Sequence, residues 1–218
     1  MDGLDDALRR AQPGRLIAVE GGEGVGKSTQ TRLLAARLRE SGVSVVETRE
    51  PGGCPMAERI RALLVTGRPE DLDSRAEWLL LMAARVEHLR VVIRPALARG
   101  EWVVCDRFSD STLAYQGYGR GLPLAELVAM NRLVLGDLTP HRVVVLDLDP
   151  VAGLARAGGD PGRGRLLENR FEREQVAFHQ RVRGGFLALA QADPVRFRVI
   201  DAALDPARVA AAVWEAMG

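Results

Sequence analysis

The stretch LIAVEGGEGVGKST (residues 16–29) places a short apolar run directly before a glycine-rich loop. Its first part, Leu16–Val19, is short, apolar and followed by glycines, and so predicts a buried strand, whereas Ser28–Glu40 repeats its leucines at helical spacing. Between them, GGEGVGKS fits the phosphate-binding pattern G-x-x-x-x-G-K-[ST]. Glycines allow successive N–H groups to turn toward phosphate oxygens, and the helix adds its positive end. We therefore predict a nucleoside triphosphate site formed by Gly21, Gly22, Glu23, Gly24, Val25, Gly26, Lys27, Ser28 and Thr29.

Lys27 is the only lysine of the chain; the other 29 of its 30 basic residues are arginines. A position that stays lysine in such a chain is a candidate for a role that arginine cannot fill. In phosphate loops that role is to reach the β- and γ-phosphates, while the next hydroxyl, here that of Ser28, holds Mg²⁺. The alternative is a glycine-rich turn with a coincidental lysine. A GTPase of the switch type is not expected, because its N-K-x-D motif needs a second lysine.

The rest of the chain alternates apolar and amphipathic segments. Further strands are predicted at 43–48, 102–105, 143–148 and 196–200, and helices at 57–65, 75–98, 124–135 and 171–190, with a last helix opened by Asp205-Pro206. Ser74 and Glu77 match a capping box ahead of the long helix, which Pro95 bends or ends. This order predicts an α/β fold: a three-layer, P-loop NTPase-type parallel sheet of about five strands between helices. Ligands of such sheets bind beyond the carboxyl ends of the strands.

Composition limits the class of protein. The 218 residues are 47% hydrophobic and carry a net charge of +1, which predicts a packed core and no general attraction to nucleic acid or membrane. No apolar run reaches membrane-spanning length, and two cysteines form no disulfide framework, so we expect a cytoplasmic protein. We expect Cys105 to be buried in its strand and Cys54 to be exposed in a loop. Residues 1–14 are predicted to be a polar extension and residues 15–218 a single domain.

Several polar side chains follow the predicted strands. Asp106 ends the third strand, where its carboxylate could hold Mg²⁺ directly or through water, and the Arg107 guanidinium could bind an anion. The alternative is that the two residues form an ordinary Asp-Arg pair on the surface. Glu23 would repel phosphates and so needs a sugar hydroxyl or a metal-bound water, unless it is a solvated loop acid. The loop after Asp110 carries Thr112, Tyr115 and Gln116, which suit a nucleobase or simply pack the loop.

Six segments, in this order, resemble bacterial thymidylate kinases of the P-loop nucleoside monophosphate kinase family. They are GGEGVGKSTQ (21–30), TREPGG (48–53), LLLMAARVEH (79–88), VVCDRFSDSTLAYQGYGRG (103–121), VVLDLDP (144–150) and NRFEREQVAFHQRV (169–182). The resemblance implies Mg²⁺-dependent transfer of the ATP γ-phosphoryl to dTMP, giving dTDP and ADP for dTTP synthesis, by a homodimer. Kinases for dUMP or another pyrimidine monophosphate, and a regulatory protein that binds ATP without transfer, are the alternatives.

The resemblance also implies roles for individual residues. It places the dTMP phosphate on Arg49 and Arg107, the base on Arg85, Thr112 and Gln116, the deoxyribose on Tyr115, and its 3′-hydroxyl on Glu23. Leu81 stands where relatives stack a phenylalanine on thymine, and Gly24 where some carry an arginine. The missing charge is expected from an arginine-rich lid at 157–169, from Arg163 and Arg165 rather than Arg156. The expected catalytic residues are Lys27, Asp106, Arg107, Arg163 and Arg165, with Mg²⁺ on Ser28 and Asp106.

Overall fold

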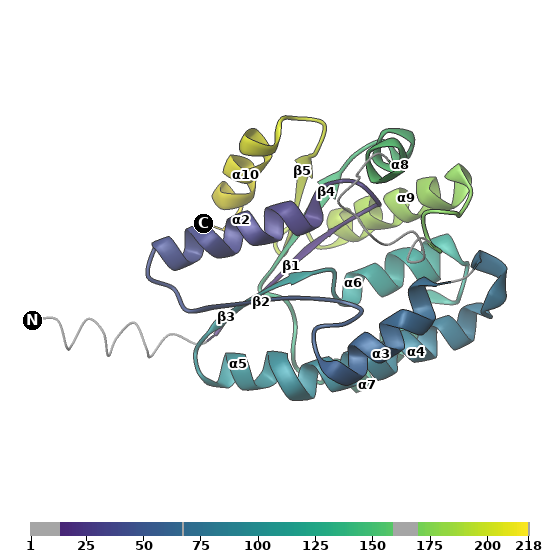
Figure 1. The fold of residues 1–218 in the computed structure, drawn as a ribbon, viewed down its shortest axis with the longest axis horizontal. Helices are drawn as coiled ribbons and strands as arrows, with labels where there is room; N and C mark the ends of the chain where they lie inside the picture. Colours follow the sequence, from purple (N-terminus) through teal and green to yellow (C-terminus); the bar gives the residue numbers. More distant parts are fainter. Residues whose placement is uncertain (1–13, 67, 159–169, 218) are drawn as a thin grey trace, which may run out of the picture.

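The structure is a computed structural model that describes residues 14–66, 68–158 and 170–217. Its centre is a parallel sheet of five strands in the order β2-β3-β1-β4-β5 (Figure 1). The predicted α/β class is confirmed. The strands are β1 (Leu16–Gly21), β2 (Val45–Arg49), β3 (Trp102–Asp106), β4 (Arg142–Asp147) and β5 (Phe197–Asp201). The helical elements are α2 (Lys27–Glu40), α3 (Pro55–Val65), η1 (Pro69–Asp71), α4 (Ser74–His88), η2 (Leu89–Ile93), α5 (Arg94–Ala98), α6 (Ser109–Thr112), η3 (Leu113–Gly119), α7 (Leu124–Leu135), α8 (Pro150–Gly158), α9 (Val176–Ala192) and α10 (Pro206–Glu215).

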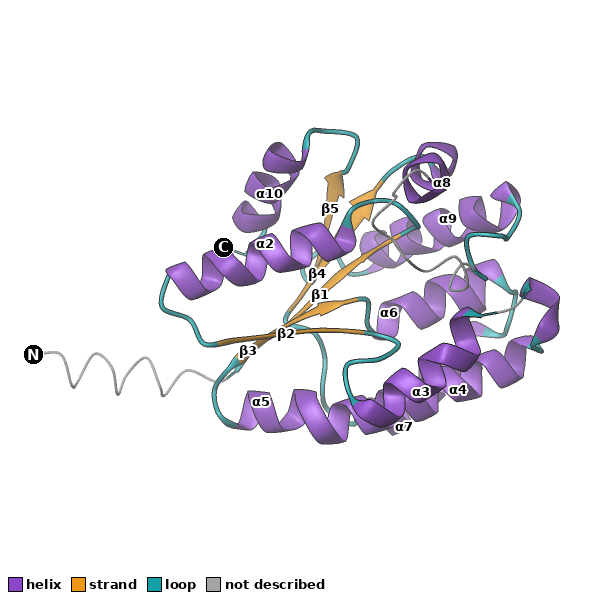
Figure 2. Cartoon of the chain, viewed as in Figure 1, coloured by secondary structure: helices purple, strands orange, loops and turns teal. Residues whose placement is uncertain are grey.

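The sheet is buried on both faces, which explains why its central strands are almost wholly apolar. Leu16 and Ala18 of β1 face one core with η2 and α9, whereas Ile17 and Val19 face a second core with α2 and α10. Helices α2 and α10 accordingly lie together on one side of the sheet, and α5 lies on the other (Figure 2). The result is the predicted three-layer arrangement.

The carboxyl ends of the three neighbouring strands β2, β3 and β1 meet at one edge of the sheet. Asp106 is in register with Arg49 on one side and with Val19 on the other, and Gly21 is in register with Leu146 of β4. The phosphate loop, Arg49 and the Asp106-Arg107 pair are therefore brought to the same edge, as expected for a parallel sheet.

The long predicted helix is three successive elements, α4, the π-helical η2 and α5, with Pro95 in the first turn of α5. The predicted capping box is wrong. Asp73 caps the helix, because its carboxylate accepts from the backbone N–H groups of Arg75 and Ala76 at 2.8 and 3.3 Å. Glu77 is instead a fully buried core residue.

Three further expectations fail locally. The helix predicted from Phe171 begins only at Val176, after a turn. The segment predicted as a loop around Thr112–Gln116 is helical, first as α6 and then as the π-helical η3. Cys54 is buried rather than exposed, as is Cys105, since the TREPGG loop packs against α4. The predicted extension at 1–14 lies outside the described residues except for Gly14.

Candidate active site

The phosphate loop, residues 21–26, turns from β1 into α2 through backbone conformations that only glycine adopts freely. Gly24 and Gly26 have φ of 68° and 94°. Gly26 immediately precedes α2 and has no side chain to cap it, so the first N–H groups of the helix stay available to a ligand. The loop therefore has the features of an anion-binding helix start.

Lys27 lies inside this loop and is 8% exposed. Its ammonium donates a hydrogen bond to the Gly22 carbonyl oxygen. Burial, and then the positive charge of Arg107, lower the pKa of Lys27 to about 8, although Glu23 and Asp106 act in the opposite direction. A polyanion placed in the loop would favour the charged form of this lysine.

Ser28 and Asp106 form an oxygen pair at the end of the loop. The Ser28 hydroxyl donates to Asp106 Oδ2 at 2.6 Å, across 78 residues of sequence. A hydroxyl and a carboxylate at this position fit Mg²⁺, which prefers oxygen ligands and usually keeps waters and substrate phosphates in its shell. Within the described ranges no group of three or more His, Cys, Asp or Glu side chains is arranged to hold a metal ion.

Arg107 joins the phosphate loop to the helical segment beyond β3. Its backbone has φ of 68°, the only such value at a non-glycine residue of the described chain. Its guanidinium donates to Glu23 Oε1 and to the Gly21 carbonyl, each at 2.8 Å, and lies 4.7 Å from the centre of the Tyr115 ring. The Tyr115 hydroxyl donates to the same Glu23 oxygen at 2.8 Å. Burial opposes the ionisation of Glu23, but Arg107, Lys27 and Tyr115 outweigh it and lower its pKa to about 2.

Glu20, at the end of β1, holds the start of this helical segment. Its carboxylate accepts from the Phe108 and Ser111 backbone N–H groups at 2.8 and 3.2 Å, and from the Ser111 hydroxyl. Burial and the charge of Asp110 raise the pKa of Glu20 to about 7. Glu20 was not among the predicted site residues, although a carboxyl at the end of a buried apolar strand was a visible signal.

Arg85 is a second buried arginine and lies behind the same segment. It donates to Glu50 Oε2 at 2.7 Å, and at 3.1 Å to the Phe108 carbonyl oxygen, the Thr112 hydroxyl and Asn131 Oδ1. The structure thus brings Arg85 and Thr112, two of the predicted base-contacting residues, together. Glu50 was missed, although it lies in the TREPGG segment.

Gln116 follows Thr112 by about one helical turn and is 1% exposed. Its amide donates to the buried carboxylate of Glu77 at 2.7 Å. Leu81, on α4, is half-buried and packs with Trp78, Met82 and Leu127.

Four arginines named in the sequence predictions remain. Arg49 lies at the end of β2, where it donates to both Glu58 oxygens at 2.9 and 3.0 Å. Arg156 lies on α8 and donates to the Ala202 carbonyl oxygen at 2.8 Å. Arg163 and Arg165, with lid residues 159–169, lie outside the described residues.

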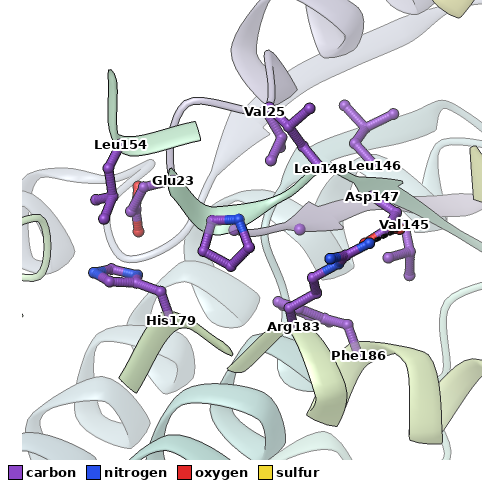
Figure 3. A pocket seen from close by; sticks show the side chains of 13 residues that line it. Glu23, Val25, Val145, Leu146, Asp147, Leu148, Leu154, His179, Arg183 and Phe186 are labelled. Atoms are coloured by element: carbon purple, nitrogen blue, oxygen red, sulfur yellow. Dashed lines mark hydrogen bonds and ion pairs between the residues drawn. The ribbon is translucent and has the colours of Figure 1, made fainter. Parts of the chain in front are cut away.

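A crevice of about 360 Å³, counted with its open mouth, lies between the phosphate loop, the end of β4, α8 and α9 (Figure 3). His179 and Arg183 of α9 both line it (Figure 3). His179 lies on the side of Glu23, whereas Arg183 pairs with Asp147 through two hydrogen bonds of 2.7 and 2.8 Å. The Nε2 atom of His179 is enclosed and has no hydrogen-bond partner among the described residues.

A parallel sheet with a glycine-rich loop after β1, a lysine inside that loop and a Ser-Asp oxygen pair beside it defines a P-loop nucleotide-binding protein. Arg107, Tyr115 and Arg85 add a second polar site next to the loop. This arrangement suits a protein that brings two phosphate-bearing molecules together.

Comparison with known proteins identifies the family. The sequence model of the family described as "Thymidylate kinase" matches residues 19–213. The thymidylate kinase of Magnetococcus marinus is 54% identical over 201 residues, 92% of this chain and 94% of that protein. That of Solidesulfovibrio magneticus is 50% identical over 204 residues, 93% and 98% of the two chains. The crystal structure of thymidylate kinase from Ehrlichia chaffeensis superposes with a TM-score of 0.75 at 36% identity, covering 94% of this chain and 100% of that one. The chain belongs to the thymidylate kinase family.

Proposed function

We propose that this protein is a phosphotransferase that moves the γ-phosphoryl group of ATP to dTMP, giving dTDP and ADP. The observation that carries the proposal is the cluster in which Arg107 contacts the phosphate loop, Glu23 and Tyr115 at once. A side chain in this place can bind an acceptor phosphate next to the donor loop. Family membership supports the choice of dTMP as acceptor.

On the donor side, the N–H groups at the start of α2 and the Lys27 ammonium would hold the ATP phosphates. Lys27 would exchange its bond to the Gly22 carbonyl for phosphate oxygens. Ser28 and Asp106 would hold Mg²⁺, directly or through water. When bound, Mg²⁺ neutralises charge on the phosphates.

On the acceptor side, Arg49 and Arg107 would bind the dTMP phosphate by charge-assisted hydrogen bonds. Tyr115 would lie beneath the deoxyribose, and Glu23, ionised through its contacts with Arg107 and Tyr115, would accept from the 3′-hydroxyl. Arg85, Thr112 and Gln116 would contact the edge of the base, and Leu81 would cover its face.

The reaction requires little of the protein beyond the alignment of its two substrates. An oxygen of the dTMP phosphate is already anionic, so it needs no general base before it attacks the γ-phosphorus. The new O–P bond forms while the bond to the bridging oxygen of ADP breaks, and the chain's cations stabilise the developing charge. We propose Arg163 and Arg165 as further cations for this step.

The second candidate acceptor is dUMP, and Leu81 is the observation that favours it. A half-buried leucine gives the base an aliphatic contact in place of a stacked aromatic ring. Such a contact discriminates weakly between thymine and uracil, because one methyl group in an apolar pocket contributes only about 1–3 kcal/mol.

We also propose that the protein is a homodimer that pairs through α3 and α4. Along these adjacent helices Met56, Leu63, Leu79 and Val86 are exposed, with Leu63 at 63% and Leu79 at 54%. Apolar side chains at helical spacing on an outer face are typical of an interface. Sedimentation of the wild type and of Leu79→Glu tests this: a wild-type monomer would contradict it.

We propose a cytoplasmic location. Both cysteines are unpaired, which supports a reducing compartment. Among the helices of the described chain, none has the length and apolarity needed to cross a membrane. We further propose that residues 15–218 act as one kinase domain. Release of the protein in the periplasmic fraction of its own bacterium would contradict the location.

The test of the proposed function is ADP formation from Mg-ATP with dTMP, dUMP, UMP, CMP, AMP, GMP or no acceptor. We expect turnover with dTMP to exceed all others, with dUMP next. Lys27→Ala should fold and lose transfer. Turnover that depends on a purine monophosphate, or ATP binding without any transfer, would contradict the proposal.

A further inference from the structure

Glu77 is a buried carboxylate that meets groups from several distant segments. It lies on α4, is fully enclosed, and accepts the Gln116 amide at 2.7 Å through Oε1. Arg120 donates to both of its oxygens, at 3.3 and 3.1 Å, and Arg170 lies 2.6 Å from Oε2. The Gln116 amide and both arginines are donors, so Glu77 is the acceptor in each of these contacts.

The contact with Glu77 fixes the orientation of the Gln116 side-chain amide. An amide side chain presents a donor NH₂ on one side and an acceptor oxygen on the other, and its two orientations fill the same space. A carboxylate can pair only with the NH₂ group. The oxygen, Oε1, is then left without a hydrogen-bond partner among the residues described here. It is not among the fully enclosed unpartnered polar atoms of those residues, so it keeps contact with solvent.

We propose that Glu77 is a specificity-determining positioning residue: by orienting Gln116, it selects a pyrimidine that carries a hydrogen on N3. The proposal rests on the proposed function, in which Gln116 faces the base. Thymine and uracil present an N3–H donor between two carbonyl oxygens, and Oε1 of Gln116 can accept it. Cytosine presents a lone pair at N3, which would face that oxygen without a proton between them.

The neighbouring donors agree with this choice. Arg85 donates to the Thr112 oxygen at 3.1 Å, and no residue in the described part of the chain accepts the Thr112 hydroxyl hydrogen, which an acceptor on the base could take. A carbonyl oxygen beside an N3–H group is such an acceptor, whereas the amino group of cytosine is not. Gln116 thus offers an acceptor and Thr112 a donor, the two kinds of group that the N3–H and an adjacent carbonyl oxygen of thymine or uracil need. Sites that hydrogen-bond a substrate group reject analogues lacking it far more strongly than apolar pockets do.

The test is the ratio of kcat/KM for dTMP to that for dCMP in four proteins: wild type, Glu77→Gln, Gln116→Leu and the double variant. In Glu77→Gln the side chain at 77 can donate or accept, so Gln116 is free to turn. We expect the ratio to fall about tenfold or more, with KM for ATP unchanged. In the Gln116→Leu background, Glu77→Gln should change the ratio no further, because it acts through Gln116.

Glu174→Gln is the matched control. Glu174 pairs with Arg120 in the same ion network but does not touch Gln116, so its loss should leave the dTMP to dCMP ratio at the wild-type value. Glu77→Asp keeps the charge beside Arg120 and Arg170 while withdrawing the acceptor from Gln116. It should lower the ratio in the same direction, and it replaces Glu77→Gln if that variant does not fold.

Two results would overturn the proposal: a folded Glu77 variant with the wild-type ratio, or an equal loss of discrimination in Glu174→Gln. Failure of the proposed function is seen separately, because the wild-type protein would then not phosphorylate dTMP at all.

Discussion

Substitution of Gly153 by alanine should disturb the phosphate loop through a contact between two backbones. A Cβ at Gly153 would lie 2.4 Å from the Glu23 carbonyl oxygen, and one at Gly24 would lie 1.8 Å from the Gly153 carbonyl oxygen. Both distances are far below van der Waals contact, and both neighbours are backbone atoms that no rotamer change can remove. Helix α8 therefore packs directly on the loop that holds Glu23. A side chain as large as arginine at position 24 has no room here.

The size of the effect follows from two opposing contributions. Alanine stabilises a helix interior by about 1 kcal/mol relative to glycine. Overpacking a tight contact costs about 1–3 kcal/mol. Gly153→Ala should therefore lower the free energy of unfolding by between zero and about 2 kcal/mol. A shift of the Glu23 peptide also displaces a partner of Arg107 and Tyr115, so kcat/KM for ATP should fall about tenfold or more.

Gly184→Ala, in the exposed interior of α9, is the matched control because nothing lies within 4 Å of its added Cβ. It should raise stability by about 1 kcal/mol and leave ATP kinetics unchanged. Urea unfolding and steady-state kinetics measure both variants. If Gly153→Ala is as stabilised as Gly184→Ala and keeps wild-type kcat/KM for ATP, the inferred contact between α8 and the loop is wrong.

Three further outcomes are expected. Burial and Arg107 lower the pKa of Lys27 to about 8. The Kd of ATP, measured by calorimetry, should therefore rise about tenfold per pH unit above pH 8 as the lysine loses its charge. The Lys27→Arg variant should lose this pH dependence, because arginine stays charged. Burial and the charge of Asp110 raise the pKa of Glu20 from 4.5 to about 7 in the folded protein. Its neutral form therefore contributes stability that is fully present below pH 4.5 and is lost as the pH rises through 7. The unfolding free energy should thus fall about 3 kcal/mol more in wild type than in Glu20→Gln between those limits, and equal falls would refute this assignment. Leu81→Phe should lower KM for dTMP about fivefold through ring stacking, and an unchanged KM would place residue 81 away from the base.

The fold could be predicted because its signals are local. Each strand is a short apolar run, each is followed by a helix with its own periodicity, and the glycine-rich loop after Leu16–Val19 specifies the first turn. The fold predictions were wrong where neighbouring residues compete for one structural role, as at the start of α4. Asp73 and Ser74 are both good helix caps, and Glu77 lies at capping-box spacing, yet its partners are Gln116, Arg120 and Arg170 from distant segments.

The candidate site was predictable where motifs are contiguous and not where contacts are long-range. The π-helical turn after Thr112 contains two glycines and polar residues, which favour a loop when only local propensity is considered. Its helical form depends on tertiary contacts, such as the Glu20 carboxylate at the start of α6 and the packing of η3 against α9. The burial of Cys54 likewise depends on α4 packing over its loop.

The most direct test of the central claim is to follow the γ-phosphoryl group itself. Purified protein is mixed with Mg²⁺, dTMP and ATP labelled with ³²P in the γ position, and the nucleotides are separated. The account predicts that the label appears in dTDP in amounts equal to the ADP formed, and that Lys27→Ala abolishes both. Label found only in inorganic phosphate, or retained in ATP while dTMP is bound, would contradict it.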